Sequence, residues 1–381
     1  MDPSRPIYLD FNATTPHAAE VVAAMKPYLE EHFGNPSSSY GYGIKTKDAV
    51  EQARRQVAEL INCQLHEIVF TSGGTESNNY AIKGVAFAQQ NKGRHIITSQ
   101  IEHPAVIEVC RFLEKSGFQT TYLPVDEYGM IDLDDLRKAI TPETILITVM
   151  HANNEVGTIQ PIEQIAEIAG KKGIAFHTDA AQSAGKIPTD VDTLGVDLMS
   201  IAGHKLYAPK GIGALYVRDG MKLEKMIHGA GQERGWRPGT ENVMQIVGLG
   251  KSCEIARRDL QENMQHMQRM RDRLLEGLKS AWPDLKLNGH PEKRLPNTLN
   301  VSFRGVKANT LLTEIKDQIA ASAGAACHSG GVDVSEVIKA MGVPLEWAKG
   351  TIRFSTGRMT TVQDIRRSVE IITEALGHAP A

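Results

Sequence analysis

The sequence predicts an α/β protein whose main sheet is largely parallel and covered by helices on both faces. Between residues 67 and 217, short apolar runs alternate with amphipathic segments, which is the pattern of such a sheet. After Gly239 the composition shifts to a long, heavily charged helical stretch, which indicates a second unit. A chain of 381 residues is also long enough for two hydrophobic cores. We expect a large domain over residues 16–257 with a seven-stranded sheet, and a smaller α+β domain formed by residues 1–15 and 258–381.

The N-terminal segment is expected to begin with a short apolar stretch and to continue with two amphipathic helices, Ala18–Leu29 and Thr46–Leu60. Small and polar residues between these helices predict a loop over Asn35–Gly43. The strands of the main sheet are expected at Glu67–Thr71, His95–Ser99, Gln119–Leu123, Thr144–Met150, Ala175–Asp179, Leu198–Ala202 and Gly213–Val217. The helices between them are expected at Glu76–Gln90, Pro104–Lys115 and Ile162–Lys172.

A long helix over Asn242–Trp282 is predicted to bridge the two domains, with an interruption or kink near Gly248 and Gly250. The elements of the smaller domain follow it. They are expected as strands at Leu299–Phe303 and Thr351–Ser355 and as helices at Asn309–Ile315, Val334–Met341 and Val362–Leu376.

Composition excludes several classes of protein. The net charge of -3 gives no electrostatic reason to expect nucleic acid or an anionic membrane as a partner. No apolar run is long enough to span a bilayer, and the N-terminus has no signal-peptide pattern, so we expect a cytoplasmic protein. The four cysteines are scattered without a C-x-x-C pair, which argues against a metal site of clustered thiolates and against a disulfide framework.

Two polar residues follow neighbouring apolar runs of the main sheet. Asp179 ends one run, and Lys205 follows Val196–Ala202. Ligands of open α/β sheets collect at the carboxyl ends of the strands, so both side chains are expected at one edge. A lysine can form a Schiff base with a carbonyl cofactor, and an acid can keep a basic ring nitrogen protonated, so the pair suits pyridoxal phosphate (PLP). A helix-capping Asp and a solvated Lys are the alternatives.

The glycine-rich segment Ser72-Gly-Gly-Thr75-Glu-Ser-Asn78 lies between a predicted strand and a predicted helix. Glycines let the backbone approach a phosphate closely, and the start of a helix supplies free N–H donors. The pattern G-x-x-x-x-G-K-[ST] is absent, so a single phosphate monoester is expected rather than a nucleotide. A helix capped by Ser or Thr after a tight turn is the alternative.

Four further polar residues are candidates for the same edge of the sheet. His103 follows a strand and could stack on a flat cofactor and shuttle protons. Asn154 follows another strand and could bond a cofactor oxygen or a substrate carboxylate, whereas Gln182 starts a helical turn after Asp179 and could reach the cofactor's phenolic oxygen. Ordinary loop and turn roles are the alternatives. Arg353 alternates with apolar neighbours in a strand and could clamp a carboxylate, with a structural ion pair as the alternative.

Cys327 lies in a run of small residues and glycines over Ala320–Gly331, which predicts a mobile segment and an accessible thiol. His328 beside it could lower the pKa of the thiol, and the thiolate is the reactive form. A small buried hydrophobe is the usual role of a free cysteine. That role is expected for Cys63, Cys110 and Cys253.

With these residues described, the chain resembles the NifS-like cysteine desulfurases and selenocysteine lyases of the class V aminotransferase group. The resemblance covers Tyr8 to Arg358 and rests on motifs in the family's order, namely TSGGTESNN, EHPAV, HANNEVG, HTDAAQ, GHKLYAPKGIGALY, GQERGWRPGTEN and IRFSTGR. The stretches around Cys327 and Gly342-Val-Pro344 are more similar to the selenocysteine lyases, and the Arg-x-Gly-His-x-Cys pattern of the family's second group is absent. The resemblance implies a PLP-dependent transferase fold of type I.

The resemblance also implies roles for individual residues. Lys205 is expected to carry the Schiff base, Asp179 to pair with the pyridine nitrogen, and His103 to stack on the ring and take part in catalysis. The other cofactor contacts that it implies are Gly74, Thr75 and His204 around the phosphate, Gln182 at the phenolic oxygen, and Thr240 from the second subunit of a homodimer.

For the substrate, the resemblance implies that Asn154 and Arg353 hold the carboxylate and that Cys327 takes the sulfur. No metal is implied. At one position the chain departs from the pattern, because Ala202 stands where many members carry a hydroxyl, which puts the affinity for the cofactor phosphate in doubt.

The expected reaction converts L-cysteine into L-alanine and leaves a persulfide on Cys327. A sulfur-acceptor protein, such as an iron–sulfur scaffold, is then the expected partner, and the sulfur supplies iron–sulfur clusters or other sulfur-containing cofactors. Release of selenide from L-selenocysteine is the alternative reaction, since the two substrates differ by one atom. A third alternative is a non-catalytic dimeric scaffold that carries sulfur, but such a protein has no need of the Asp179 and Lys205 pair.

Overall fold

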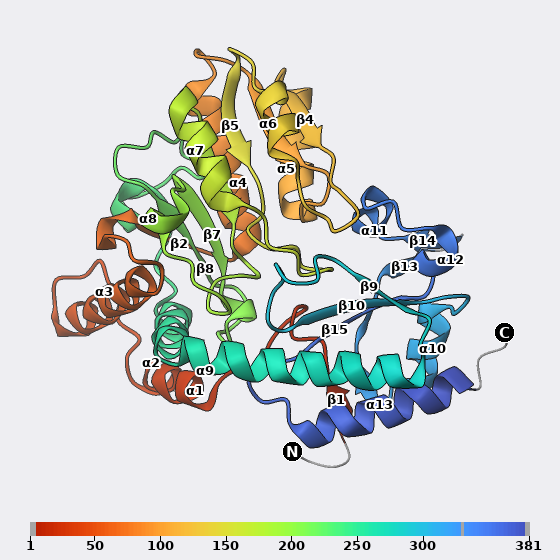
Figure 1. The fold of residues 1–381 in the computed structure, drawn as a ribbon. Coiled ribbons are helices and arrows are strands. Elements are labelled where there is room, and N and C mark those ends of the chain that lie inside the picture. The colour runs from red at the N-terminus through yellow and green to blue at the C-terminus, as the bar shows by residue number, and fades with distance from the viewer. Residues whose placement is uncertain (1–4, 329–330, 378–381) are drawn as a thin grey trace.

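Seven strands form the main sheet of the computed structural model, in the order β2-β8-β7-β6-β5-β3-β4 (Figure 1). The structure describes residues 5–328 and 331–377, and for residues 325–328 and 331–333 only the backbone is described. The strands are β2 (Ile68–Thr71), β3 (His95–Ser99), β4 (Gln119–Leu123), β5 (Thr144–Thr148), β6 (Ala175–Asp179), β7 (Leu198–Ala202) and β8 (Gly213–Val217). Only β8 runs antiparallel to its neighbours. The predicted seven-stranded, mainly parallel sheet is therefore confirmed.

Each face of the main sheet is buried under helices, because successive side chains of a strand point to opposite faces. One face packs against α3 (Gly41–Ile61), α7 (Ile162–Lys172) and the start of α9 (Val243–Ala281) through Phe70, Ile97 and Ile147. The other packs against α4 (Gly74–Gln89) and α5 (Pro104–Lys115) through Val69, Ile96 and Leu146. Two short helices that the sequence did not predict are α6 (Leu133–Ala139) and α8 (Val191–Leu194). Burial on both faces explains why these strands read as continuous apolar runs.

A smaller antiparallel sheet has the order β12-β15-β10-β9. Its strands are β9 (Leu285–Asn288), β10 (Thr298–Phe303), β12 (Ser322–Ala323) and β15 (Thr351–Ser355). Its separate core is closed by the C-terminal half of α9 and by α10 (Ala308–Ile315) and α13 (Val362–Gly377). Two further strand pairs are β1 (Ile7–Tyr8) with β11 (Ile319–Ala320), and β13 (Ala325–His328) with β14 (Gly331–Val334).

Three predicted helices have clearly different boundaries in the structure. The helix expected from Thr46 begins at Gly41, as α3, and so includes the end of the loop expected over Asn35–Gly43. The stretch expected as one helix from Ala18 is divided into α1 (Ala19–Met25) and α2 (Pro27–Glu30), because Pro27 has no N–H to continue the ladder of α1. The helix expected from Val334 begins two residues later, as α11 (Glu336–Ala340), and α12 (Leu345–Ala348) follows it. Val334 pairs in the β13–β14 hairpin instead, and Ser335 caps α11 with its side chain.

The predicted interruption of the long helix is wrong, because α9 is one continuous helix of 39 residues. It passes both sheets and joins the two cores, as Figure 1 shows. The glycines have a packing role. A Cβ atom at Gly250 would lie 2.5 Å from the Cα atom of Ala53 in α3, so only glycine allows this close approach of the two helices.

Replacing Gly250 with alanine is therefore expected to destabilise the protein. The overpacking cost of about 1–3 kcal/mol outweighs the gain in helix propensity of about 1 kcal/mol. Gly170 in α7 is a matched control, since it is exposed and a Cβ there meets no atom within 4 Å. In thermal melting monitored by circular dichroism, Gly250→Ala should have a lower melting temperature than the parent protein. Gly170→Ala should have the same melting temperature as the parent or a higher one. Equal melting temperatures for both variants would contradict this role of Gly250.

Candidate active site

A cavity of about 300 Å³ opens at the carboxyl edge of the main sheet. Its walls come from the loops that follow β3, β5, β6 and β7, from the start of α4, from the N-terminal segment and from β15. Nine of the eleven predicted site residues line it: Gly74, Thr75, His103, Asn154, Asp179, Gln182, His204, Lys205 and Arg353. Strand order alone brings most of them together, as expected for an open α/β sheet.

Asp179 lies buried at the end of β6 and is held at both carboxylate oxygens. Asn78 of α4 donates to Oδ2 at 2.6 Å, and the backbone N–H of Ala181 donates to Oδ1 at 2.9 Å. These bonds fix the carboxylate at the wall of the cavity. Asn78 was not predicted as a site residue, although it belongs to the glycine-rich segment that was singled out.

Lys205 ends a short 3₁₀ turn directly after β7 and is half-buried. Its Nζ atom donates to the carbonyl oxygens of Asn12 and Ala13 at 2.6 and 2.7 Å. Burial and, after it, the positive charge of Arg353 lower the pKa of Lys205 to about 8, although Asp10 and Asp179 oppose the shift. Near neutral pH a sizeable fraction of this amine is therefore uncharged, which is the form that attacks a carbonyl group.

His103 caps the start of α5 at the rim of the cavity. Its Nδ1 atom accepts a hydrogen bond from the N–H of Ala105 at 3.1 Å, so the proton of the neutral ring lies on Nε2. Desolvation lowers the pKa of His103, Lys205 lowers it as well, and Asp179 opposes both. The ring is thus neutral at physiological pH and can present a flat face and one N–H group.

The start of α4 provides the features of an anion site. Gly73 at its N-cap has a φ of +152°, and among the described residues no side chain caps the helix, which argues against the alternative of a Ser- or Thr-capped turn. Thr75 and His204 line the same cavity as the uncapped start of α4. Burial and then nearby lysines lower the pKa of His204 to about 4, so its ring is a neutral partner. Ala202 also lines this end and contributes no hydroxyl.

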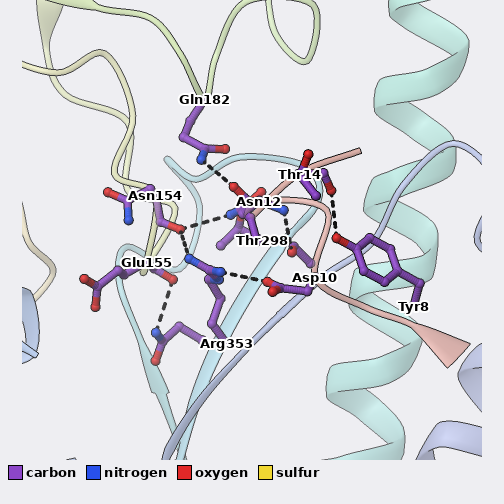
Figure 2. A network of polar contacts seen from close by, with 12 residues as sticks. Tyr8, Asp10, Asn12, Thr14, Asn154, Glu155, Gln182, Thr298 and Arg353 are labelled. Carbon is purple, nitrogen blue, oxygen red and sulfur yellow. Dashed lines mark hydrogen bonds and ion pairs between the residues drawn. The ribbon is translucent and has the colours of Figure 1, made fainter. Parts of the chain in front are cut away.

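Arg353 on β15 is buried and reaches across to the N-terminal segment, as Figure 2 shows. Its Nη2 atom donates to Oδ1 of Asp10 at 2.7 Å and its Nη1 atom to the carbonyl oxygen of Asn154 at 3.0 Å. The ion-pair alternative is therefore present in the structure. The Nε atom of Arg353 is buried and has no hydrogen-bond partner among the described residues, and the side chain also lines the cavity, where a carboxylate could meet its positive charge.

Gln182 lies in a turn after β6, where the N–H of Ser183 bonds the carbonyl oxygen of Ala180, and no α-helix begins there. Its side-chain Nε2 atom donates to the carbonyl oxygen of Asn12 at 3.0 Å. Asn12 was not predicted as a site residue. Nothing in its local sequence marks it, because its partners lie far along the chain.

Two predicted site residues are not placed in the cavity. The backbone of Cys327 lies in β13, opposite Val332 of β14, but its side chain lies outside the part that the structure describes, so its accessibility stays a prediction. Directly after this hairpin, Ser335 donates to the carboxylate of Glu155, the residue that follows Asn154. Thr240 is exposed and does not line the cavity of its own chain.

The other three cysteines have the structural role that was expected. Cys110 and Cys253 are buried, and burial raises the pKa of each thiol to about 12. Burial also raises the pKa of Cys63. Thiols with such pKa values hold almost no thiolate near neutral pH. Within the described ranges, no cluster of three or more His, Cys, Asp or Glu side chains could hold a metal ion, and no helix is long and apolar enough to cross a membrane.

Comparison with known proteins gives consistent matches over nearly the whole chain. The family model described as "Aminotransferase class-V" matches residues 7–367. A protein named "Cysteine desulfurase IscS" from Dictyoglomus turgidum is 50% identical over 369 residues, which are 97% of this chain and 94% of that protein. A protein of the same name from Methanosarcina thermophila is 50% identical over 372 residues, covering 97% of this chain and 92% of that protein.

Solved structures agree with the sequence matches. A structure titled "NIFS-LIKE PROTEIN" has a TM-score of 0.93 and 39% identity, and the match covers 98% of this chain and 100% of that one. A structure titled "SspA in complex with cysteine" has a TM-score of 0.81 and 38% identity, covering 93% of this chain and 99% of that one.

Proposed function

Because the chain belongs to the aminotransferase class-V family, we propose that it is a cysteine desulfurase that uses PLP to convert L-cysteine into L-alanine. The observation that carries this proposal is the cavity at the ends of β6 and β7, where an amine and a fixed carboxylate lie together. Relatives that are 46–50% identical are named cysteine desulfurases, which supports L-cysteine as the substrate. The selenocysteine alternative is not favoured, although the stretch around Cys327 suggested it.

The residues of the cavity fit PLP. Lys205 offers an amine with a lowered pKa for the aldehyde, and the buried Asp179 offers a fixed negative charge for the ring nitrogen. At the other end, the uncapped start of α4 offers N–H groups to a phosphate, with Gly74, Thr75 and His204 beside it. When bound, PLP supplies a ring that accepts electrons from the substrate.

In the proposed mechanism, the side chains of this chain orient the substrate and move its protons. Arg353 and Asn154 hold the substrate carboxylate, and His103 stacks on the flat ring. The freed amine of Lys205 removes the proton from Cα of the substrate. The thiolate of Cys327 then attacks the substrate sulfur. A sulfur–sulfur bond forms as the carbon–sulfur bond breaks, and the electron pair of the broken bond stays with Cβ, which takes up a proton as L-alanine forms. Cys327 then carries the transferred sulfur as a persulfide, and this sulfur is passed on to an acceptor.

The remaining parts of the proposal concern assembly and partners. We propose a homodimer in which Thr240 of one chain reaches the cofactor phosphate of the other, and the exposure of Thr240 supports this. Exposed apolar side chains around α2 and the start of α3, such as Phe33 at 81%, support an interface between copies. We further propose a cytoplasmic location, a sulfur-acceptor protein such as an iron–sulfur scaffold, and domains at residues 16–257 and at 1–15 with 258–381.

A competition assay tests the proposed function. The protein purified with PLP is given L-cysteine and L-selenocysteine together, and alanine, sulfide and selenide are measured. We expect alanine and sulfide from L-cysteine at a rate that depends on PLP. Absence of alanine from L-cysteine would contradict the proposal, and alanine formed only with selenide would favour the selenocysteine reaction.

A further inference from the structure

Lys186 is a buried lysine behind the wall of the cavity, in the turn that follows β6. Its side chain is only 5% exposed, and buried lysines are rare unless they are paired with an acid. The hydrogen bonds that its Nζ atom makes are to amide oxygens, at 2.8 Å to Oε1 of Gln182 and at 3.2 Å to Oδ1 of Asn12. Among the described residues, both hydrogen bonds of this amine are thus donated to neutral amide oxygens and neither to a carboxylate.

The surroundings of this amine disfavour its protonation. Burial places the pKa of Lys186 well below its usual value, and the positive charges of Lys205 and Arg353 act in the same direction. Asp10, an acid near Lys205, is paired with Arg353. Lys186 thus acts on Gln182 and Asn12 through hydrogen bonds.

Asn12 connects Lys186 to the residues that line the cavity. Its backbone carbonyl oxygen accepts hydrogen bonds from Nε2 of Gln182 at 3.0 Å and from Nζ of Lys205 at 2.6 Å. Its side-chain Nδ2 atom donates to the carbonyl oxygen of Asn154 and to Oγ1 of Thr298, and these bonds are drawn in Figure 2. Asn12 is thereby held on every side, and it presents one fixed carbonyl oxygen to the site.

The side-chain amide of Gln182 has only one favourable orientation in this arrangement. Its oxygen faces the donor on Lys186, and its nitrogen faces the acceptor on Asn12. If the amide were turned over, nitrogen would face nitrogen and oxygen would face oxygen, and two buried hydrogen bonds would be lost. Of these two partners, Lys186 contributes its side chain, whereas Asn12 contributes its backbone carbonyl oxygen.

We propose that Lys186 is a positioning residue that keeps the N–H groups of Gln182 directed toward the cavity, where they can donate to the phenolic oxygen of PLP. This inference rests on the proposed function, because it concerns the contact between Gln182 and the cofactor. Without Lys186, one of the two hydrogen bonds that fix this orientation is lost, and the amide can turn and present its oxygen to the ring oxygen of the cofactor. The donor is then lost even though Gln182 itself is intact.

A spectroscopic titration of four PLP-loaded proteins tests this role: the parent, Lys186→Met, Gln182→Met and the double variant. A hydrogen-bond donor to the phenolic oxygen makes that oxygen less basic, so it binds less tightly the proton that it shares with the Lys205 nitrogen. Loss of the donor should therefore raise the pH midpoint of the visible absorption band, by about one unit. We expect a rise in both single variants and, in the double variant, the same midpoint as in Gln182→Met, because Lys186 acts through Gln182.

The controls separate this role from its rivals. Lys172→Met, an exposed lysine at the end of α7, should leave the midpoint unchanged. If Lys186 acted through its charge on Lys205 instead, its replacement would shift the midpoint equally with and without Gln182, and this would overturn the proposal. An unchanged midpoint in Lys186→Met would also overturn it. If the methionine variant does not fold, Lys186→Gln serves instead: it keeps an N–H donor but no charge, so its midpoint should stay at the parent value, and a rise would contradict the proposal.

The test also distinguishes the inference from the proposed function. If PLP gives no visible band with the parent protein, the proposed function is wrong and the role of Lys186 falls with it. If the parent shows the band and forms alanine from L-cysteine but Lys186→Met has the parent midpoint, only the inference about Lys186 is wrong.

Discussion

Alanine formation from L-cysteine is expected to fall by about 10²–10⁴-fold or more when Lys205 is replaced with alanine. The variant loses both the amine that binds the aldehyde and the base that removes the Cα proton. Lys186 cannot replace it, because that amine lies behind Gln182 and its hydrogen bonds are directed to two amide oxygens. The measurements are the rate of alanine formation and the visible absorbance of the protein after PLP is added.

Lys222→Ala is the matched control for this prediction, since Lys222 is exposed and does not line the cavity. It should keep both the parent rate and the parent spectrum. A Lys205→Ala protein with the parent spectrum and more than about a tenth of the parent rate would show that another amine carries the chemistry.

Replacing Cys327 with alanine should abolish persulfide formation while the PLP spectrum and the binding of L-cysteine are retained. The expected loss of sulfur transfer is about 10³-fold or more, because the nucleophile itself is removed. Binding is retained because the residues that fit the cofactor and the substrate carboxylate lie on other elements. Mass spectrometry of the protein after reaction with L-cysteine detects the added sulfur, and an alanine assay follows turnover.

Cys63→Ala is the control, because Cys63 is partly buried and its raised pKa leaves it unreactive. This variant should carry the same added sulfur as the parent protein. Full sulfide release by Cys327→Ala would rule out Cys327 as the residue that takes the sulfur. A persulfide on Cys63 in the parent protein would show that Cys63 takes the sulfur instead.

Much of the candidate site could be predicted from the sequence because of one property of parallel sheets. The carboxyl ends of such strands share an edge, so a polar residue directly after an apolar run is placed by the run itself. His103, Asn154, Asp179 and Lys205 all follow strands in this way, and all four line the cavity. Strand periodicity is local, so no knowledge of the tertiary fold was needed to locate them.

The contacts that hold these residues could not be predicted. Asn12 lies 170 positions from Gln182 and 193 from Lys205, and no local pattern joins it to them. The ion pair between Asp10 and Arg353 spans 343 positions, and the sequence left open whether Arg353 clamps a carboxylate or forms a structural ion pair. In the structure Arg353 forms the pair and still keeps a free donor at Nε among the described residues.

The sequence by itself determined the α/β class, the seven strands and the edge at which the site lies, because these depend on local periodicity and on the rule for parallel strands. Only the tertiary structure decided that α9 is continuous, that Arg353 is paired with Asp10, and that Lys186 is buried against Gln182 and Asn12. These features depend on the approach of segments that are distant in the chain. Hydrogen bonds and close helix contacts act over a few ångströms, so the packed fold alone selects which of them form.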